Sequence, residues 1–136
     1  MRARHNAAPM PDALLNLFIR QRALWRALLA LLVAVILWLA LSPAPPRTVD
    51  TGWDKANHAM AFAALGFVSV WALWPRPRDW AWLALALLAF GGAIEIAQSF
   101  LPPREGDWAD LLADGAGIAL GLLVALPITA MLARSR

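Results

Sequence analysis

Cysteine is absent from this 136-residue chain, and charged residues make up only 15% of it. Without cysteine the chain has no disulfide framework, no thiolate metal site and no cysteine nucleophile. The scarcity of charge, together with 61% hydrophobic residues and a mean hydropathy of +0.59, excludes an ordinary soluble domain. The net charge of +3 comes from arginines that flank apolar runs, so the composition does not predict nucleic-acid binding.

Four apolar stretches are long enough to cross a bilayer, which takes about 20 mostly apolar residues. They cover residues 24–41, 56–74, 80–100 and 108–132. Proline-containing segments separate them, and the tight turn at residues 75–79 makes the second and third stretches neighbours. The sequence therefore predicts an all-α integral membrane protein, an antiparallel bundle of four transmembrane helices.

The transmembrane domain accordingly covers residues 24–132, between a basic N-terminal segment (1–23) and a basic C-terminal tail (133–136). Two interpretations of the N-terminal segment stay open: a short amphipathic helix over residues 12–21 that lies along the cytoplasmic interface, or a frayed basic tail. Cleavage as a signal peptide is disfavoured, because the apolar run is long and a cut near Ser42 would place proline just after it.

The basic residues near the spans are distributed unevenly, and loops rich in Lys and Arg stay in the cytoplasm. Nine of the twelve lie on the side of the two termini, against Arg47, Lys55 and Arg104 on the other side. Both termini are therefore expected to be cytoplasmic. Seven of the nine acidic residues fall in or beside the opposite face, and the eight tryptophans are interpreted as anchors at the two membrane boundaries.

Polar residues concentrate at the non-cytoplasmic ends of three spans. Ionisable side chains inside a span cost at least a few kcal/mol each, so they usually face the bundle interior and pair there. At a rise of about 1.5 Å per residue, His58, Glu95 and Asp110 each lie within roughly 10 Å of the outer boundary. Residues three or four apart share a helix face, and the spacing within each group fits that rule. The expected substrate- or partner-binding residues are Asp54, Lys55, His58, Glu95, Gln98, Arg104, Asp107, Asp110 and Asp114.

Several kinds of chemistry are open to this group. A histidine beside carboxylates can relay protons or act as general acid or base, so His58, Glu95 and Asp110 are the catalytic candidates. Lysine and arginine suit an anionic head group or phosphate. No metal site and no cofactor are predicted, because the second histidine, His5, is expected to lie across the membrane; carboxylates that hold magnesium together with a phosphate are the alternative.

Small residues beneath the polar groups are candidates for close helix packing. Gly117 and Gly121 form a Gly-x-x-x-Gly pair, and Gly91 and Gly92 lie one turn before Glu95. The competing explanation is chance, because a Gly-x-x-x-Gly pair alone is a weak signal in an alanine-rich chain. The four glycines are the expected helix-packing residues.

Three motifs, in order over roughly residues 53–121, resemble the signature of the VanZ-like family. They are Asp54-Lys55-x-x-His58, Glu95-x-x-Gln98 and Arg104-x-x-Asp107-x-x-Asp110-x-x-x-Asp114-x-x-Gly117. The resemblance implies a small bacterial multi-pass protein of the cytoplasmic (inner) membrane. The family is typified by a protein linked to low-level resistance to teicoplanin-type glycopeptides, and its biochemical activity is not established. The family commonly has asparagine where this chain has Asp114, which adds a charge here.

Three functional hypotheses remain open. In the first, a non-enzymatic membrane protein binds an anionic lipid, an envelope precursor or a partner at its outward polar groups and changes envelope properties or glycopeptide susceptibility. In the second, a small membrane enzyme acts on a lipid-linked or phosphate-bearing substrate. The third, a proton- or ion-coupled transporter, needs a homo-oligomer, and the inner half of the bundle offers no polar relay. The sequence favours the first hypothesis, with the lipid bilayer as the expected partner.

Overall fold

The computed structural model describes residues 21–44, 54–73, 76–102 and 106–134. These ranges hold no strand, and the N-terminal segment up to residue 20, with its two open interpretations, lies outside them. The described helices are α2 (Arg22–Leu41), α3 (Asp54–Leu73), the 3-10 helix η2 (Pro77–Asp79), α4 (Trp80–Gln98) and α5 (Trp108–Arg134). The four α-helices are long and apolar enough to cross a membrane, which confirms the all-helical fold with four candidate spans. Their ends lie within two residues of the predicted ones.

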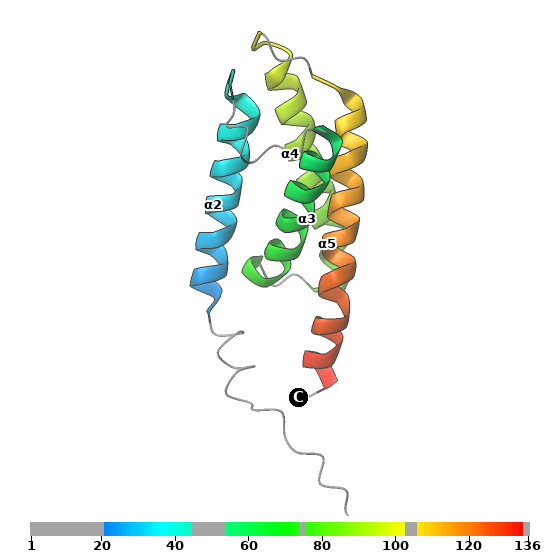
Figure 1. Cartoon of the computed structure of the whole chain (residues 1–136). Coiled ribbons are helices and arrows are strands. Elements are labelled where there is room, and N and C mark those ends of the chain that lie inside the picture. Colours follow the sequence, from blue (N-terminus) through cyan, green and yellow to red (C-terminus); the bar gives the residue numbers. More distant parts are fainter. Residues whose placement is uncertain (1–20, 45–53, 74–75, 103–105, 135–136) are drawn as a thin grey trace, which may run out of the picture.

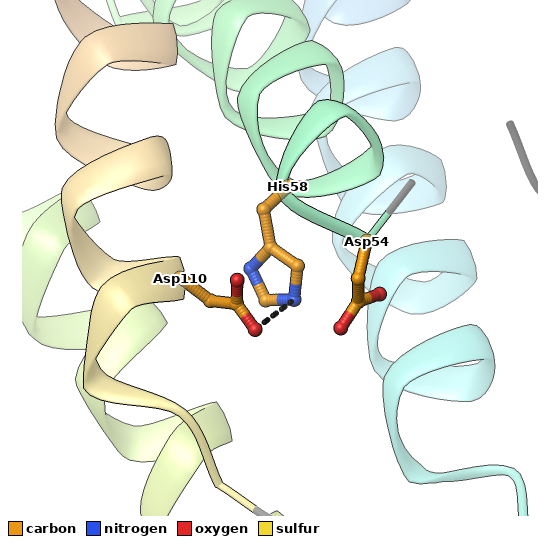
Figure 2. A group of neighbouring side chains, drawn as sticks. All are labelled: Asp54, His58 and Asp110. Carbon is orange, nitrogen blue, oxygen red and sulfur yellow. Dashed lines mark ion pairs between the residues drawn. The ribbon is translucent and has the colours of Figure 1, made fainter. Parts of the chain in front are cut away.

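The four α-helices run alternately in opposite directions (Figure 1). As a result, α2 begins and α5 ends at one end of the bundle, whereas α3 and α5 both begin at the other end. That second end, here termed the polar end, is where side chains of Asp54, His58 and Asp110 lie close together (Figure 2). The side of the membrane that each end faces stays a prediction from the arginine distribution.

Prolines set two of the helix boundaries. Helix α2 ends at Leu41 because Ser42 adopts an extended backbone ahead of Pro43, and the residue before a proline is driven out of the helical region. In the same way Arg76 is extended ahead of Pro77, which opens η2 and turns the chain into α4. The short connection keeps α3 and α4 antiparallel neighbours, as the sequence predicted.

Helices α3 and α5 form the most extensive helix pair, and glycines allow their backbones to approach closely. A Cβ atom built on Gly117 would overlap the backbone oxygen of Ala59, and one on Gly121 would overlap that of Ala63. From the other side, a Cβ atom on Gly66 would lie 3.1 Å from a backbone oxygen of α5. The Gly-x-x-x-Gly pair therefore lies in the contact between α3 and α5.

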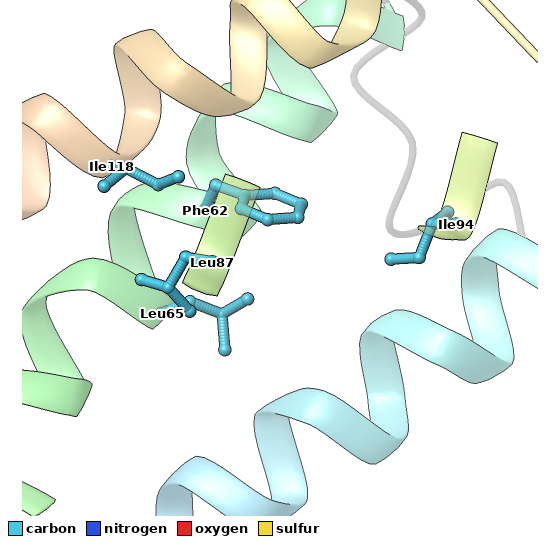
Figure 3. Close-up of a cluster of buried hydrophobic side chains, with 5 residues drawn as sticks. All are labelled: Phe62, Leu65, Leu87, Ile94 and Ile118. Atoms are coloured by element: carbon cyan, nitrogen blue, oxygen red, sulfur yellow. The ribbon is translucent and has the colours of Figure 1, made fainter. Parts of the chain in front are cut away.

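The apolar core lies between α3, α4 and α5, and α2 covers it from one side. Its buried side chains are Phe62, Leu65, Leu87, Ile94 and Ile118 (Figure 3). Helix α2 contributes no fully buried residue, but Leu32 and Ile36 pack partly buried against this cluster. Large apolar side chains on the outer faces are exposed, for example Leu112 at 77%, as helices surrounded by lipid require.

Trp71 departs from its expected role as an interfacial anchor. Its side chain is only 1% exposed, and its ring centroid lies 6.2 Å from that of Trp25 and 5.9 Å from that of Phe67. An anchor must reach the interfacial layer of the membrane, which a buried ring does not. Trp71 therefore packs α2 against α3. The expected anchors Trp53 and Trp74 lie outside the described residues.

Candidate functional site

Polar side chains from α3, α4 and the start of α5 meet at the polar end. The side chains of Glu95, Asp110 and Asp114 are buried there, with exposed fractions for the residues of 2%, 4% and 0%. Seven of the nine binding residues expected from the sequence take part in this group, here termed the polar centre: Asp54, Lys55, His58, Glu95, Asp107, Asp110 and Asp114.

His58 lies in the middle of the polar centre. Its Nδ1 atom is hydrogen-bonded to Asp114 Oδ1 at 2.9 Å, and its Nε2 atom lies 3.9 Å from Asp110 Oδ2. Because Asp114 holds one ring nitrogen, the other is directed toward Asp110 and Asp54, as Figure 2 shows. The sequence hypothesis paired His58 with Glu95 or Asp110, but its hydrogen bond goes to Asp114, one turn deeper in α5 than Asp110.

Lys55 joins α3 to the start of α5. Its Nζ atom donates to Asp107 Oδ2 at 2.9 Å and to Asp110 Oδ1 at 3.3 Å. Asp107 lies just before α5, and its Oδ1 atom accepts the backbone N–H of Ala109 at 2.8 Å, as helix-capping aspartates do. The Lys55 ammonium, and then the Ala109 N–H, stabilise the charged carboxylate and hold the pKa of Asp107 below its ordinary value.

Glu95 joins α4 to the residues that lead into α5. Its Oε2 atom accepts the backbone N–H of Asp107 at 2.7 Å. Gly106 lies directly against the α4 backbone, because a Cβ atom there would lie 2.5 Å from the backbone oxygen of Glu95. Sequence reasoning missed Gly106: a single glycine in a loop does not reveal that another helix passes beside it.

Gly91 provides the space that the Asp114 carboxylate occupies. A Cβ atom on Gly91 would overlap Asp114 Oδ2 and lie 3.2 Å from the ring of Phe62. The packing prediction does not hold at Gly92, because a Cβ atom there would have nothing within 4 Å. Adjacent residues on a helix point about 100° apart, so only one of these two glycines can face Asp114.

Gln98 and Arg104 are the two expected residues that are not placed in the polar centre. Gln98 is buried, and its Nε2 atom donates to the backbone oxygen of Ala40 at 3.1 Å. Ala40 lies in the last turn of α2, where carbonyl groups have no partner within their own helix. Gln98 therefore joins α4 to α2. Arg104 lies outside the described residues.

The polar centre is acidic among the described residues: five carboxylates face one lysine and one imidazole. The lysine is already hydrogen-bonded to two of the carboxylates. Two buried oxygens, Glu95 Oε1 and Asp114 Oδ2, have no hydrogen-bond partner among the described residues. Chemically, the centre suits a positively charged ligand, and the paired imidazole and carboxylate suit acid–base chemistry.

Comparison with known proteins found a match to one protein-family model. The family model for VanZ/LLP1 matches residues 7–131, which include all three polar motifs and most of the described helices. Searches of curated proteins and of solved structures returned no match.

Proposed function

Since this chain belongs to the VanZ/LLP1 family, we propose that it acts at the bacterial cell envelope, in the cytoplasmic (inner) membrane. In this proposal the polar centre faces outward and binds the head group of an anionic lipid or a lipid-linked envelope precursor, which alters susceptibility to teicoplanin-type glycopeptides. The observation that carries the proposal is the burial of Glu95, Asp110 and Asp114 at the end of the bundle where α3, α4 and α5 meet. Charged groups inside a span are expensive, which favours a binding or chemical role over packing alone.

The negative charge of the polar centre restricts which ligands can bind there. A head group that enters the polar centre from outside meets Lys55, whose side chain is 41% exposed and already paired with Asp107 and Asp110. Because carboxylates outnumber bases among the described residues, an anionic ligand needs positive charge beyond that of Lys55. This condition favours a head group that carries hydroxyl or amine donors beside its phosphate, since carboxylates accept hydrogen bonds from both.

An enzyme that acts on the same class of molecule is the second candidate, and the contact between His58 and Asp114 favours it. A buried carboxylate that holds one ring nitrogen orients the imidazole and leaves the other nitrogen to accept or donate a proton. In this reading His58 is the acid or base and Asp114 is its orienting partner. The enzyme consumes a lipid-linked substrate, whereas the binding protein leaves it unchanged.

A complementation experiment tests both candidates. The gene is deleted and restored as wild type, His58→Ala, Glu95→Ala or the control Asp79→Ala, which removes a half-exposed carboxylate of η2 at the opposite end of the bundle. We expect both polar-centre variants to lose teicoplanin-related complementation and the control to retain it. Unchanged lipid-linked intermediates favour binding, and an intermediate that accumulates with His58→Ala favours the enzyme. Full complementation by both variants at wild-type protein levels would contradict both candidates.

The outward orientation has its own test. Because the chain has no cysteine, a single introduced cysteine reports its own position without background. Ser99 is exposed at the polar end, and Arg76 is exposed at the opposite end. A membrane-impermeant maleimide should label Ser99→Cys in intact cells and leave Arg76→Cys unlabelled. The reverse pattern would place the polar centre in the cytoplasm and end the envelope-ligand proposal.

A further inference from the structure

Asp54, His58 and Asp110 converge on one point of the polar centre. One ligand atom from each, an imidazole nitrogen and two carboxylate oxygens, lies within 4.8 Å of the others. Figure 2 shows the His58 ring between the two carboxylates. Ligands bound at about 2.1 Å around a tetrahedral ion lie roughly 3.4 Å apart, so a movement of less than about 1.5 Å brings the three into place. Asp54 is exposed at the first residue of α3 and can make that movement.

The Asp110 carboxylate points independently to a missing positive charge. Asp110 is 4% exposed, and its Oδ1 atom accepts from Lys55, whereas its Oδ2 atom has no hydrogen bond from a described residue and faces His58 Nε2 at 3.9 Å. Glu95 is 2% exposed, and its Oε1 atom faces the other ring nitrogen, His58 Nδ1, at 3.9 Å, where it adds negative charge beside the imidazole. A carboxylate oxygen without a hydrogen bond in a buried residue costs free energy, which a cation bound at Asp110 Oδ2 offsets.

The far side of the His58 ring has the arrangement found at metal sites. A metal-bound histidine usually donates its other ring N–H to a carboxylate, which fixes the tautomer and aims the remaining nitrogen at the ion. The fully buried Asp114 carboxylate provides that acceptor, 2.9 Å from Nδ1. With the proton on Nδ1, the Nε2 lone pair faces Asp110 and Asp54 (Figure 2).

We propose that Asp54, His58 and Asp110 bind a divalent transition-metal cation, with Zn²⁺ as the best fit. An imidazole nitrogen with two carboxylates suits zinc better than Mg²⁺ or Ca²⁺, which favour oxygen ligands alone. Three protein ligands leave a fourth position for water or a phosphate oxygen. A metal site was not predicted from the sequence, because no second histidine is expected at this end of the bundle. In the proposed site, the carboxylates of Asp54 and Asp110 serve as ligands instead of a second histidine. The ion also supplies the charge that an anionic head group needs, and only this last step rests on the proposed function.

The test uses the full-length, tag-free protein in detergent, with His5→Gln in every version so that His58 is the single histidine. Equilibrium dialysis against Zn²⁺ alone should show one ion per chain, which a chelator removes. We expect His58→Gln and Asp110→Asn to abolish this binding and Asp114→Asn to weaken it by about 10- to 100-fold. Asp79→Asn, at the opposite end of the bundle, should bind Zn²⁺ as the parent protein does.

A second variant and a second probe keep the result independent of folding. Asp54 is exposed, so Asp54→Asn leaves the buried core unchanged and should still weaken Zn²⁺ binding by at least about tenfold. Co²⁺ should give visible absorption bands that His58→Gln removes. The proposal is overturned if the parent protein fails to bind Zn²⁺, or if Asp54→Asn and Asp110→Asn bind it as tightly as the parent. Because no lipid is present, either result leaves the head-group proposal to the complementation experiment.

Discussion

Replacing Gly117 by alanine tests the close approach of α3 and α5, on which the polar centre depends. The added methyl carbon would lie 2.9 Å from the carbonyl carbon of Ala59 and closer still to its oxygen. Non-bonded carbon atoms have their lowest energy at about 3.5–4.0 Å, so the two backbones must separate by at least about 0.6 Å at this point. Since Gly117 lies one turn below Asp114, the separation also pulls Asp114 away from His58.

Two opposing effects determine the size of the change. Alanine is more favourable than glycine in a helix interior by about 1 kcal/mol, whereas overpacking a tight contact costs about 1–3 kcal/mol. Gly92→Ala is the matched control, because it makes the same chemical change in a helix where the new methyl group meets nothing within 4 Å. The propensity gain is common to both variants, so the free energy of unfolding should be about 1–3 kcal/mol lower for Gly117→Ala than for Gly92→Ala.

The assay is unfolding by SDS in mixed micelles, followed through the fluorescence of the eight tryptophans. Gly117→Ala should unfold at a lower SDS fraction than the wild type, and Gly92→Ala at the same fraction or a higher one. Gly121→Ala should resemble Gly117→Ala, because its methyl carbon would lie 2.8 Å from the backbone nitrogen of Phe67. Equal unfolding free energies for the Gly117 and Gly92 variants would refute the close contact between α3 and α5.

Two further contacts give measurable predictions. Because the Lys55 ammonium and the Ala109 N–H lower the pKa of Asp107, their stabilisation is present above its ordinary value of 3.8 and is lost as pH falls through the lowered value. The difference in Tm between the wild type and Asp107→Asn should therefore be seen at about pH 6 and vanish well below pH 3.8, and a constant difference would contradict the contact. Gln98→Leu leaves the Ala40 carbonyl without its donor and should lower the free energy of unfolding by about 1–3 kcal/mol in the SDS titration; an unchanged value would mean that Gln98 does not hold α2.

The helices could be predicted from the sequence because their causes are local. The length of an apolar run sets the length of a span, and prolines mark helix boundaries: α2 ends ahead of Pro43, and Pro77 opens η2 before α4. The depth of the polar residues could be predicted too, because rise per residue converts sequence position into height along the bundle. Both predictions, of span length and of residue depth, need only the sequence of a single helix.

The pairings within the polar centre could not be predicted in the same way, because they depend on how each helix is rotated against its neighbours. Spacing placed Asp110 and Asp114 on one face of α5, but it did not say which of them reaches the His58 ring. The choice depends on Gly91 of a third helix, which leaves the space that Asp114 fills. Gln98 is a second example. Its position in the sequence predicted a place in the polar centre, but its side chain donates a hydrogen bond to the backbone oxygen of Ala40 in α2.

The direction of the helices explains why the polar centre is acidic. Both α3 and α5 begin at the polar end, and the first turn of a helix carries partial positive charge. That charge stabilises Asp54 and Asp110 but opposes Lys55, whose ammonium depends on Asp107 and Asp110 instead. The polar centre therefore favours a positively charged ligand between Asp54, His58 and Asp110. It follows that a phosphate-bearing head group should bind weakly to the metal-free protein and more tightly when a cation accompanies it, since the carboxylates otherwise repel it.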